Sequence, residues 1–273
     1  MSHPRLSSHA GFTLVELLVV TAIIAVLATL GFSATQGVQR KARQTRELHA
    51  ARQLITAYLA YPPDHDGELL RGFDKAAQEV TLPGGRLISG EMATRYPWRL
   101  APYLGEQVEG VLLVNDNQRQ TAGKAADSFE YTYRVSLNPA LGINAYCIGG
   151  YHDGTASGYF QSDVVRRLAG TAYASGLIVF ASARMKASAN SEETAGHFLI
   201  TPPKLWRTKW DAQYDPAKPS ANFGNVALRW EDRAICAFLD GSVRLLAAAE
   251  LSDMRRWSAT AAENDDPNFT VPR

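Results

Sequence analysis

An apolar run near the N-terminus constrains this chain more than any other feature of its sequence. Residues 12–32 carry a single charged side chain, Glu16, and a short polar segment of residues 1–11 precedes them. A helix rises about 1.5 Å per residue, so roughly 20 residues match the thickness of about 30 Å of a bilayer's hydrocarbon core. Backbone polar groups in lipid must be satisfied within the segment, which leaves a helix as the structure of such a run. We therefore expect a membrane-spanning helix over residues 12–33.

Glu16 is an unusual residue in this run. A carboxylate within a membrane segment costs roughly 2.5–3.5 kcal/mol on insertion scales and tends to mark function. A position near the lipid headgroups is the simpler interpretation, because Glu16 lies close to the start of the run. The residues around it, Gly11-Phe12-Thr13-Leu14-Val15-Glu16, resemble the prepilin N-terminal cleavage and methylation motif of type IV pilins and type II secretion pseudopilins.

The resemblance implies a processed and assembling N-terminus. Residues 1–11 would be a leader peptide, a prepilin peptidase would cut after Gly11 and N-methylate Phe12, and Glu16 would pair with the N-terminal amine of Phe12 in a neighbouring subunit. Such a pair neutralises a buried charge and sets axial register. A cleaved secretory signal ending near residues 32–34 and a plain single-span anchor are the alternatives. The basic residues between positions 40 and 52 favour, by the positive-inside rule, an orientation opposite to that of a pilin.

The fold class expected from the remaining sequence is α+β, with a long N-terminal helix packed on an antiparallel β-sheet head, as in pilins. Over residues 34–61 apolar side chains recur at three- and four-residue spacing, which predicts an amphipathic continuation of the helix. Pro62 and Pro63 end it. Residues 62–262 form the predicted β-rich head and residues 263–273 a flexible tail. The strands are expected within residues 110–114, 129–135, 176–180, 198–201, 226–230 and 234–239.

Asp240-Gly241 between two β-prone runs predicts a hairpin with a tight primed turn. The segment around Trp230 and this turn also resembles the H-X9-DG region of large pilin-like proteins of planctomycetes and verrucomicrobia. Trp230 stands where that region has its histidine, and Ser242 where a second histidine often follows. These departures put any metal-binding or assembly role of the region in doubt. Asp240-Gly241 is best explained as a pair of turn-forming residues.

The composition and the absence of known motifs exclude several classes of function. The formal net charge of +1 provides no footprint for nucleic acid. The sequence contains no G-x-S-x-G, H-E-x-x-H, P-loop or G-x-G-x-x-G pattern, so we expect no enzyme, no catalytic residues and no bound cofactor or metal. Calcium is the one candidate ion, at residues 64–68 or 151–154, although neither segment has full calcium-loop spacing. Cys147 and Cys236 either form one disulfide or stay as buried thiols.

These features together predict a structural subunit of a type II secretion pseudopilus or type IV pilus-like filament. Its expected location is the inner membrane, as a single-pass protein with the head in the periplasm or outside the cytoplasm. Its expected partners are prepilin peptidase, other pilin or pseudopilin subunits and membrane lipid. The alternative is a membrane-anchored extracytoplasmic module that binds a glycan or another ligand and does not polymerise.

Overall fold

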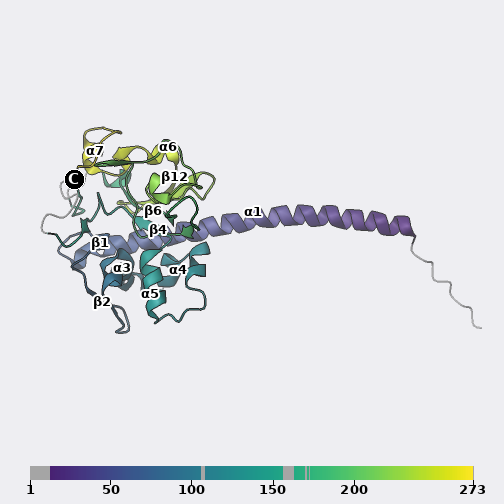
Figure 1. Cartoon of the computed structure of the whole chain (residues 1–273), viewed down its shortest axis with the longest axis horizontal. Helices are drawn as coiled ribbons and strands as arrows, with labels where there is room; N and C mark the ends of the chain where they lie inside the picture. Colours follow the sequence, from purple (N-terminus) through teal and green to yellow (C-terminus); the bar gives the residue numbers. More distant parts are fainter. Residues whose placement is uncertain (1–12, 106–107, 156–162, 170, 172, 273) are drawn as a thin grey trace, which may run out of the picture. The chain divides into compact units, whose positions relative to one another are not determined.

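The computed structural model describes residues 13–105, 108–155, 163–169, 171 and 173–272, without the side chains of residues 30–34. The chain divides into two units, residues 1–44 and residues 45–273 (Figure 1). The predicted fold class is confirmed, because a long N-terminal helix, α1 (Leu14–Ala60), is followed by antiparallel sheets in a mixed α+β structure. The predicted domain boundaries at residues 11, 33, 61 and 262 stay predictions.

The first unit consists, as far as it is described, of the N-terminal part of α1. Its apolar side chains from Leu14 to Leu27 are exposed, by 79% at Leu14 and 63% at Leu27. No helix in the described part of the chain is long and apolar enough to cross a membrane. The predicted location in the inner membrane is therefore wrong. A span needs about 20 apolar residues, and the last apolar side chain that the structure describes in this run is Ala28.

In the second unit, the end of α1 supplies one wall of the core. Ala51, Leu54, Ile55 and Tyr58 are buried, and their spacing places them on one helical face. The helix ends at Ala60 because Pro62 begins a short 3₁₀ turn, η1 (Pro62–Asp64), and proline cannot donate the amide hydrogen that a helix needs.

The main sheet has four antiparallel strands in the order β12-β11-β6-β4. Its two central strands are almost entirely buried, which explains their continuous apolar sequences. Tyr58 of α1 meets Phe180 of β6 edge-on, with ring centroids 5.5 Å apart. Figure 1 shows the end of α1 between this sheet and a group of short helices, α3 to α5. The strands are β4 (Leu141–Ile143), β6 (Ile178–Ser182), β11 (Arg233–Phe238) and β12 (Val243–Ala247).

The predicted hairpin is present as β11 and β12, but its turn differs from the expected one. The Gly241 amide donates to the Phe238 carbonyl and the Phe238 amide to the Ser242 carbonyl, each at 2.9 Å. Gly241 has φ of +85°, whereas Asp240 is not among the residues with positive φ, so this is no type I′ turn. Asp240 instead accepts a hydrogen bond from the Ser242 amide at 2.9 Å, which confirms its role in turn chemistry.

Two segments predicted as strands are helices. Residues 110–114 overlap α4, and residues 129–135 lie in α5. Ser128 caps α5 by accepting a hydrogen bond from the Tyr131 amide at 3.2 Å. Residues 198–201 and 226–230 join the sheets only through single bridges, at Leu199 and Val226.

The other helices and turns are short, and several join the helical group or follow the last strand. They are α2 (Glu91–Thr94), α3 (Tyr96–Leu104), α4 (Val108–Leu112), η3 (Asn115–Gln120), α5 (Phe129–Leu137), η4 (Ala174–Gly176), η5 (Ser220–Phe223), α6 (Ala248–Leu251), η6 (Met254–Arg256) and α7 (Ala259–Glu263).

The remaining strands pair two by two outside the main sheet. They are β1 (Phe73–Asp74) with β5 (Tyr151–His152), β2 (Glu79–Thr81) with β3 (Leu87–Ser89), β7 (Arg184–Met185) with β8 (Thr194–Ala195), and β9 (Lys204–Leu205) with β10 (Thr208–Lys209). Residues 263–273, expected to be a flexible tail, contact the head at Val271. This side chain is fully buried, and its carbonyl accepts from the Trp206 amide at 2.7 Å.

Candidate functional site

Of the three N-terminal candidate residues, the structure describes only Glu16. Gly11 and Phe12, the predicted processing residues, lie outside the described residues. Glu16 lies in the first turn of α1 and is tied to Thr13. Its Oε2 accepts from the Thr13 amide at 2.9 Å and from the Thr13 hydroxyl at 2.7 Å, while the Glu16 amide donates to Thr13 Oγ1 at 3.3 Å.

This reciprocal pair is a capping box, in which two amides at the helix start find side-chain partners. The hydroxyl hydrogen bond of Thr13, followed by that of its amide, lowers the pKa of Glu16. Glu16 therefore carries a negative charge at neutral pH, as pairing with an amine requires. Sequence reasoning missed this second role, although the spacing of Thr13 and Glu16 is that of a capping box.

From Leu14 to Leu27 the surface of α1 is apolar on all sides, apart from Glu16 and Thr21. A helix of that kind is normally buried, because exposed apolar patches of such extent mark interaction surfaces. We call this segment the apolar helix surface. Its exposed side chains, 44–79% accessible, are Leu14, Val15, Leu17, Leu18, Val19, Val20, Ile23, Ile24, Val26 and Leu27.

An ionised carboxylate at the start of an exposed, apolar helix that precedes an α+β head is an arrangement suited to association through the N-terminal helix. Residues 6–32 match the family described as the prokaryotic N-terminal methylation motif, and this match supports the resemblance of the segment to type IV pilin-like proteins and pseudopilins. No curated protein matches the chain, and neither does any solved structure. The H-X9-DG resemblance stays a prediction.

Glu47 is a buried carboxylate where α1 meets the sheet within the head. Its side chain is fully buried, and Oε1 accepts a hydrogen bond from the Ser182 hydroxyl of β6. Arg229 lies 3.7 Å from Oε2, which has no hydrogen-bond partner among the described residues. The Arg229 guanidinium also donates to the Ala183 carbonyl. Glu47 thus fixes the helix to the sheet through one hydrogen bond and one charge contact.

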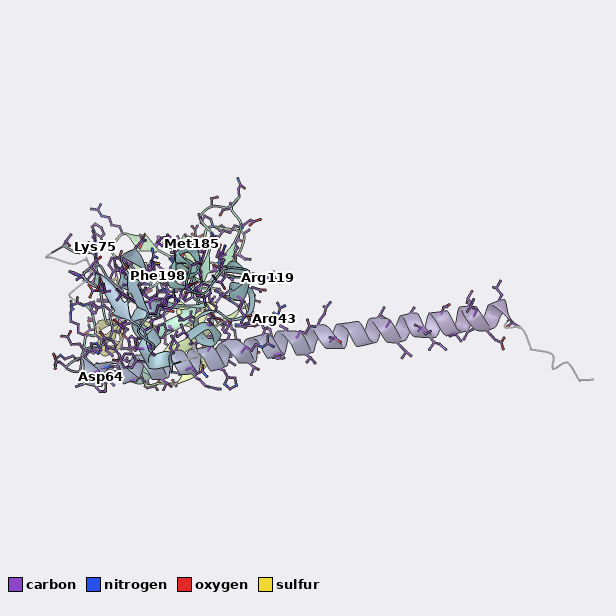
Figure 2. The ribbon with its side chains drawn as sticks, turned by 90° about the horizontal axis from the view of Figure 1, so that it is seen from below. Arg43, Asp64, Lys75, Arg119, Met185 and Phe198 are labelled. Atoms are coloured by element: carbon purple, nitrogen blue, oxygen red, sulfur yellow. The ribbon has the colours of Figure 1, made fainter. Side chains whose placement is uncertain are left out.

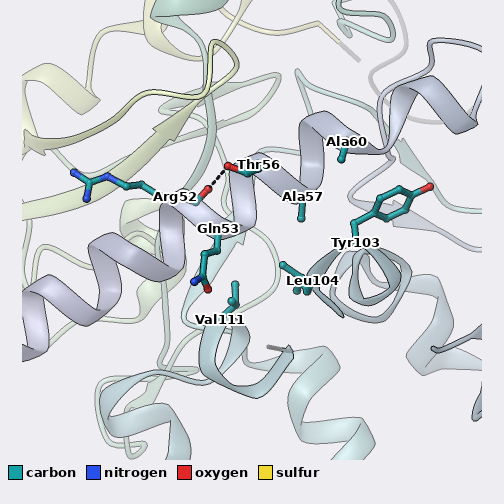
Figure 3. Close-up of a pocket in the computed structure, with 8 residues that line it drawn as sticks. All are labelled: Arg52, Gln53, Thr56, Ala57, Ala60, Tyr103, Leu104 and Val111. Carbon is teal, nitrogen blue, oxygen red and sulfur yellow. Dashed lines mark hydrogen bonds between the residues drawn. The ribbon is translucent and has the colours of Figure 1, made fainter. Parts of the chain in front are cut away.

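A groove of about 370 Å³ runs beside the same part of α1 (Figure 3). Figure 3 shows Gln53 and Ala57 of α1 on one side and Leu104 and Val111 of the short helices on the other. The lining is mainly apolar and holds no cluster of catalytic groups. The other lining residues are Arg52, Thr56, Ala60 and Tyr103.

The two segments considered for calcium lie in the head and form other contacts. Asp64 accepts from the Tyr103 hydroxyl at 3.1 Å, and His152 Nδ1 lies 2.9 Å from Asp74 Oδ1. Asp153 accepts from the Thr155 amide at 2.9 Å. Within the described ranges no group of three His, Cys, Asp or Glu side chains is placed to hold a metal ion. Calcium binding stays a prediction.

Cys147 and Cys236 are both buried and both free. Burial raises the pKa of each thiol. Trp210 joins the core by packing on Phe223 and Trp257, with ring centroids 4.2 and 5.5 Å apart. Trp206, in contrast, has 42% of its surface exposed.

Proposed function

We propose that this chain is the precursor of a structural subunit of a pilus-like or pseudopilus filament. Maturation would consist of cleavage after Gly11 and N-methylation of Phe12 by a prepilin peptidase. The match of residues 6–32 to the N-terminal methylation motif carries the proposal. Members of this family serve as structural subunits.

The geometry of the first turn of α1 supports this function. Glu16 is ionised, exposed and two turns or less from the new N-terminus that cleavage would create. The amine of a neighbouring subunit would meet a carboxylate that Thr13 already orients. The apolar helix surface would be covered by equivalent surfaces of other subunits.

Mass spectrometry of the N-terminal peptide, from protein isolated from the cell that produces it, tests the maturation step. A peptide that begins with N-methylated Phe12 supports the proposal. An intact Met1 or an N-terminus near Thr35 contradicts it.

Substitution of Glu16 tests the assembly step, and Thr13 offers a matched control. Glu16→Ala removes the carboxylate and with it the hydrogen bonds from Thr13, whereas Thr13→Ala removes the hydroxyl hydrogen bonds and keeps the carboxylate. We expect Glu16→Ala to be cleaved normally but to be excluded from filaments. Thr13→Ala should be cleaved and incorporated. Equal incorporation of both variants would rule out the pairing role of Glu16.

A second candidate function is a ligand-binding module that does not polymerise. A charged hollow in the head, described below, favours it, because its volume of about 440 Å³ lies in the range of small-molecule sites. Crosslinking of the mature protein in cells distinguishes the two functions. A ladder of crosslinked chains supports the filament, and a single monomeric species supports the module.

A further inference from the structure

A hollow of about 440 Å³ opens in the head beside the end of α1. The chain that follows α1 forms most of it, and Arg99 of α3 and Arg167 complete it. Three arginines, Arg71, Arg99 and Arg167, face three acidic residues, Asp66, Glu68 and Asp74. The charge that a ligand would meet therefore depends on which of these groups are already paired with one another.

Two of the arginines have carboxylate partners. Arg71 Nη1 donates to Asp74 Oδ2 at 3.0 Å, and His152 holds the other oxygen of Asp74. Arg167 lies 3.6 Å from Glu68. Arg99 is the cation of this hollow that no carboxylate of the described residues contacts directly, although the negative charge of Asp74 acts on it from farther away.

The Arg99 guanidinium is held in place by carbonyl groups. Its Nη2 donates to the carbonyls of Arg71, at 2.5 Å, and Thr94, at 3.0 Å. Its Nε is buried and finds no hydrogen-bond partner within the part of the chain that the structure describes. Burial lowers the pKa of Arg99 to about 10, so the group remains charged at neutral pH while it is poorly solvated. A fixed, desolvated cation of this kind attracts an anion strongly.

The surrounding groups restrict which anion fits. Glu68 and Asp66 would repel a dianion such as phosphate more than they repel a single carboxylate. The rings of Tyr61 and His65 stack with centroids 3.6 Å apart, which places a flat aromatic surface beside the charges. Polar side chains at the rim can hydrogen-bond hydroxyl groups, whereas Leu69 supplies little apolar area.

We propose that this hollow binds a sugar acid, with Arg99 as the partner of the carboxylate and the rim side chains as partners of the hydroxyls. The carboxylate supplies a directly bonded counter-charge to Arg99, which Asp74 reaches only from farther away, and the sugar ring lies against the pair formed by Tyr61 and His65. The residues that line this site belong to the head and are separate from the apolar helix surface.

Calorimetric titration of the full chain, in a mild detergent that covers its apolar helix surface, tests the proposal with three probes. Glucuronate should bind, with affinity that falls as salt is added. Glucose, which lacks the carboxylate, and inorganic phosphate should each bind at least about tenfold more weakly, because a charge-assisted hydrogen bond is lost or a repulsion is gained. Equal binding of glucose, tighter binding of phosphate, or no binding of glucuronate up to about 50 mM would overturn the proposal.

Three variants locate the site. Arg99→Gln should weaken glucuronate binding at least about tenfold. Glu68→Gln should strengthen it by up to about fivefold, because the substitution releases Arg167 and removes a negative charge. Glu68 is half exposed, so this variant keeps the test valid even if Arg99→Gln is poorly folded.

Arg119→Gln is the matched control, since Arg119 is 79% exposed and paired with Asp116 at 3.3 Å. Figure 2 shows Arg119 and Asp64, the neighbour of His65, on opposite sides of the head. Glucuronate affinity should be unchanged in this variant. Loss of binding in Arg119→Gln, or weaker binding in Glu68→Gln, would overturn the assignment.

Discussion

At the scale of single residues, the most consequential side chain of the head is Glu47. It is a fully buried carboxylate with one hydrogen bond, from Ser182, and one nearby cation, Arg229 at 3.7 Å. Burying a charge is costly, and removing one partner of a buried pair leaves the other uncompensated. Arg229 keeps some contact with solvent, with 23% of its side chain exposed, which limits that penalty.

We expect Glu47→Ala to lower the free energy of unfolding of the head by about 2–4 kcal/mol, because it removes the carboxylate that accepts from Ser182 and faces Arg229 and opens a cavity. Urea titration followed by tryptophan fluorescence measures the change. Arg46→Ala, one residue away on the exposed side of the helix, should change stability by less than about 0.5 kcal/mol. Equal effects of the two variants would show that Glu47 does not hold the helix to the sheet.

His197 makes the stability of the head depend on pH. Burial, with a smaller contribution from the charge of Arg95, lowers the pKa of His197 to about 4. In the unfolded chain this histidine binds a proton at a higher pH, near 6.5, so the free energy of unfolding of the head falls as pH drops from about 6.5 to about 4. This decrease is at most about 3 kcal/mol, and it should be smaller because the residue is partly exposed. His197→Gln should remove this part of the acid destabilisation, which urea titrations at pH 7 and pH 5 would reveal.

At the scale of elements, sequence reasoning succeeded where one physical effect dominated. The end of α1 at two prolines and the hairpin at Asp240-Gly241 were both predictable from backbone chemistry. Residues 129–135 were not, because Phe129, Tyr131 and Tyr133 alternate with polar residues as in a strand. The buried side chains are instead Tyr131, Thr132, Val135 and Ser136, which have the spacing of a helix. Contacts distant in sequence decided the outcome.

Ser128 provides the local signal that favours helix in this segment, and it can be tested. Ser128→Ala removes the side-chain acceptor for the Tyr131 amide, so the free energy of unfolding should fall by about 1 kcal/mol. Ser128→Asp keeps an acceptor at the helix start and should be nearly neutral. Denaturation midpoints of the two variants provide the measurement, and equal losses would contradict the capping role.

For the candidate sites, sequence reasoning identified Glu16 but could not find the charged hollow. Glu16 belongs to a contiguous motif, whereas the hollow joins Arg71, Arg99 and Arg167 across almost a hundred residues. No spacing rule connects such positions, because their proximity depends on the packing of α3 against the chain that follows α1. The capping box of Thr13 and Glu16 is visible in the sequence as a threonine followed by a glutamate three residues later.

At the scale of the whole molecule, the two units have opposite surface character. Residues 45–273 enclose a core, whereas the described part of residues 1–44 exposes its apolar side chains. The head should therefore unfold as one cooperative unit, with its buried groups inaccessible until it does so. The reactivity of Cys147 and Cys236 reports on whether the head unfolds cooperatively, because both thiols are fully buried and free.

We expect neither thiol to react with a thiol-specific reagent in the folded protein, since burial raises the pKa of both and blocks access. After denaturation without reductant, two thiols per chain should react. With increasing urea, both should become reactive together at the unfolding midpoint measured by fluorescence. The Cys147→Ser variant should lose one thiol, and its remaining thiol should become reactive at that variant's own unfolding midpoint, which a buried hydroxyl lowers. No reactive thiol after denaturation would mean that the two cysteines form a disulfide, and early reaction of one thiol would mean that part of the head opens separately.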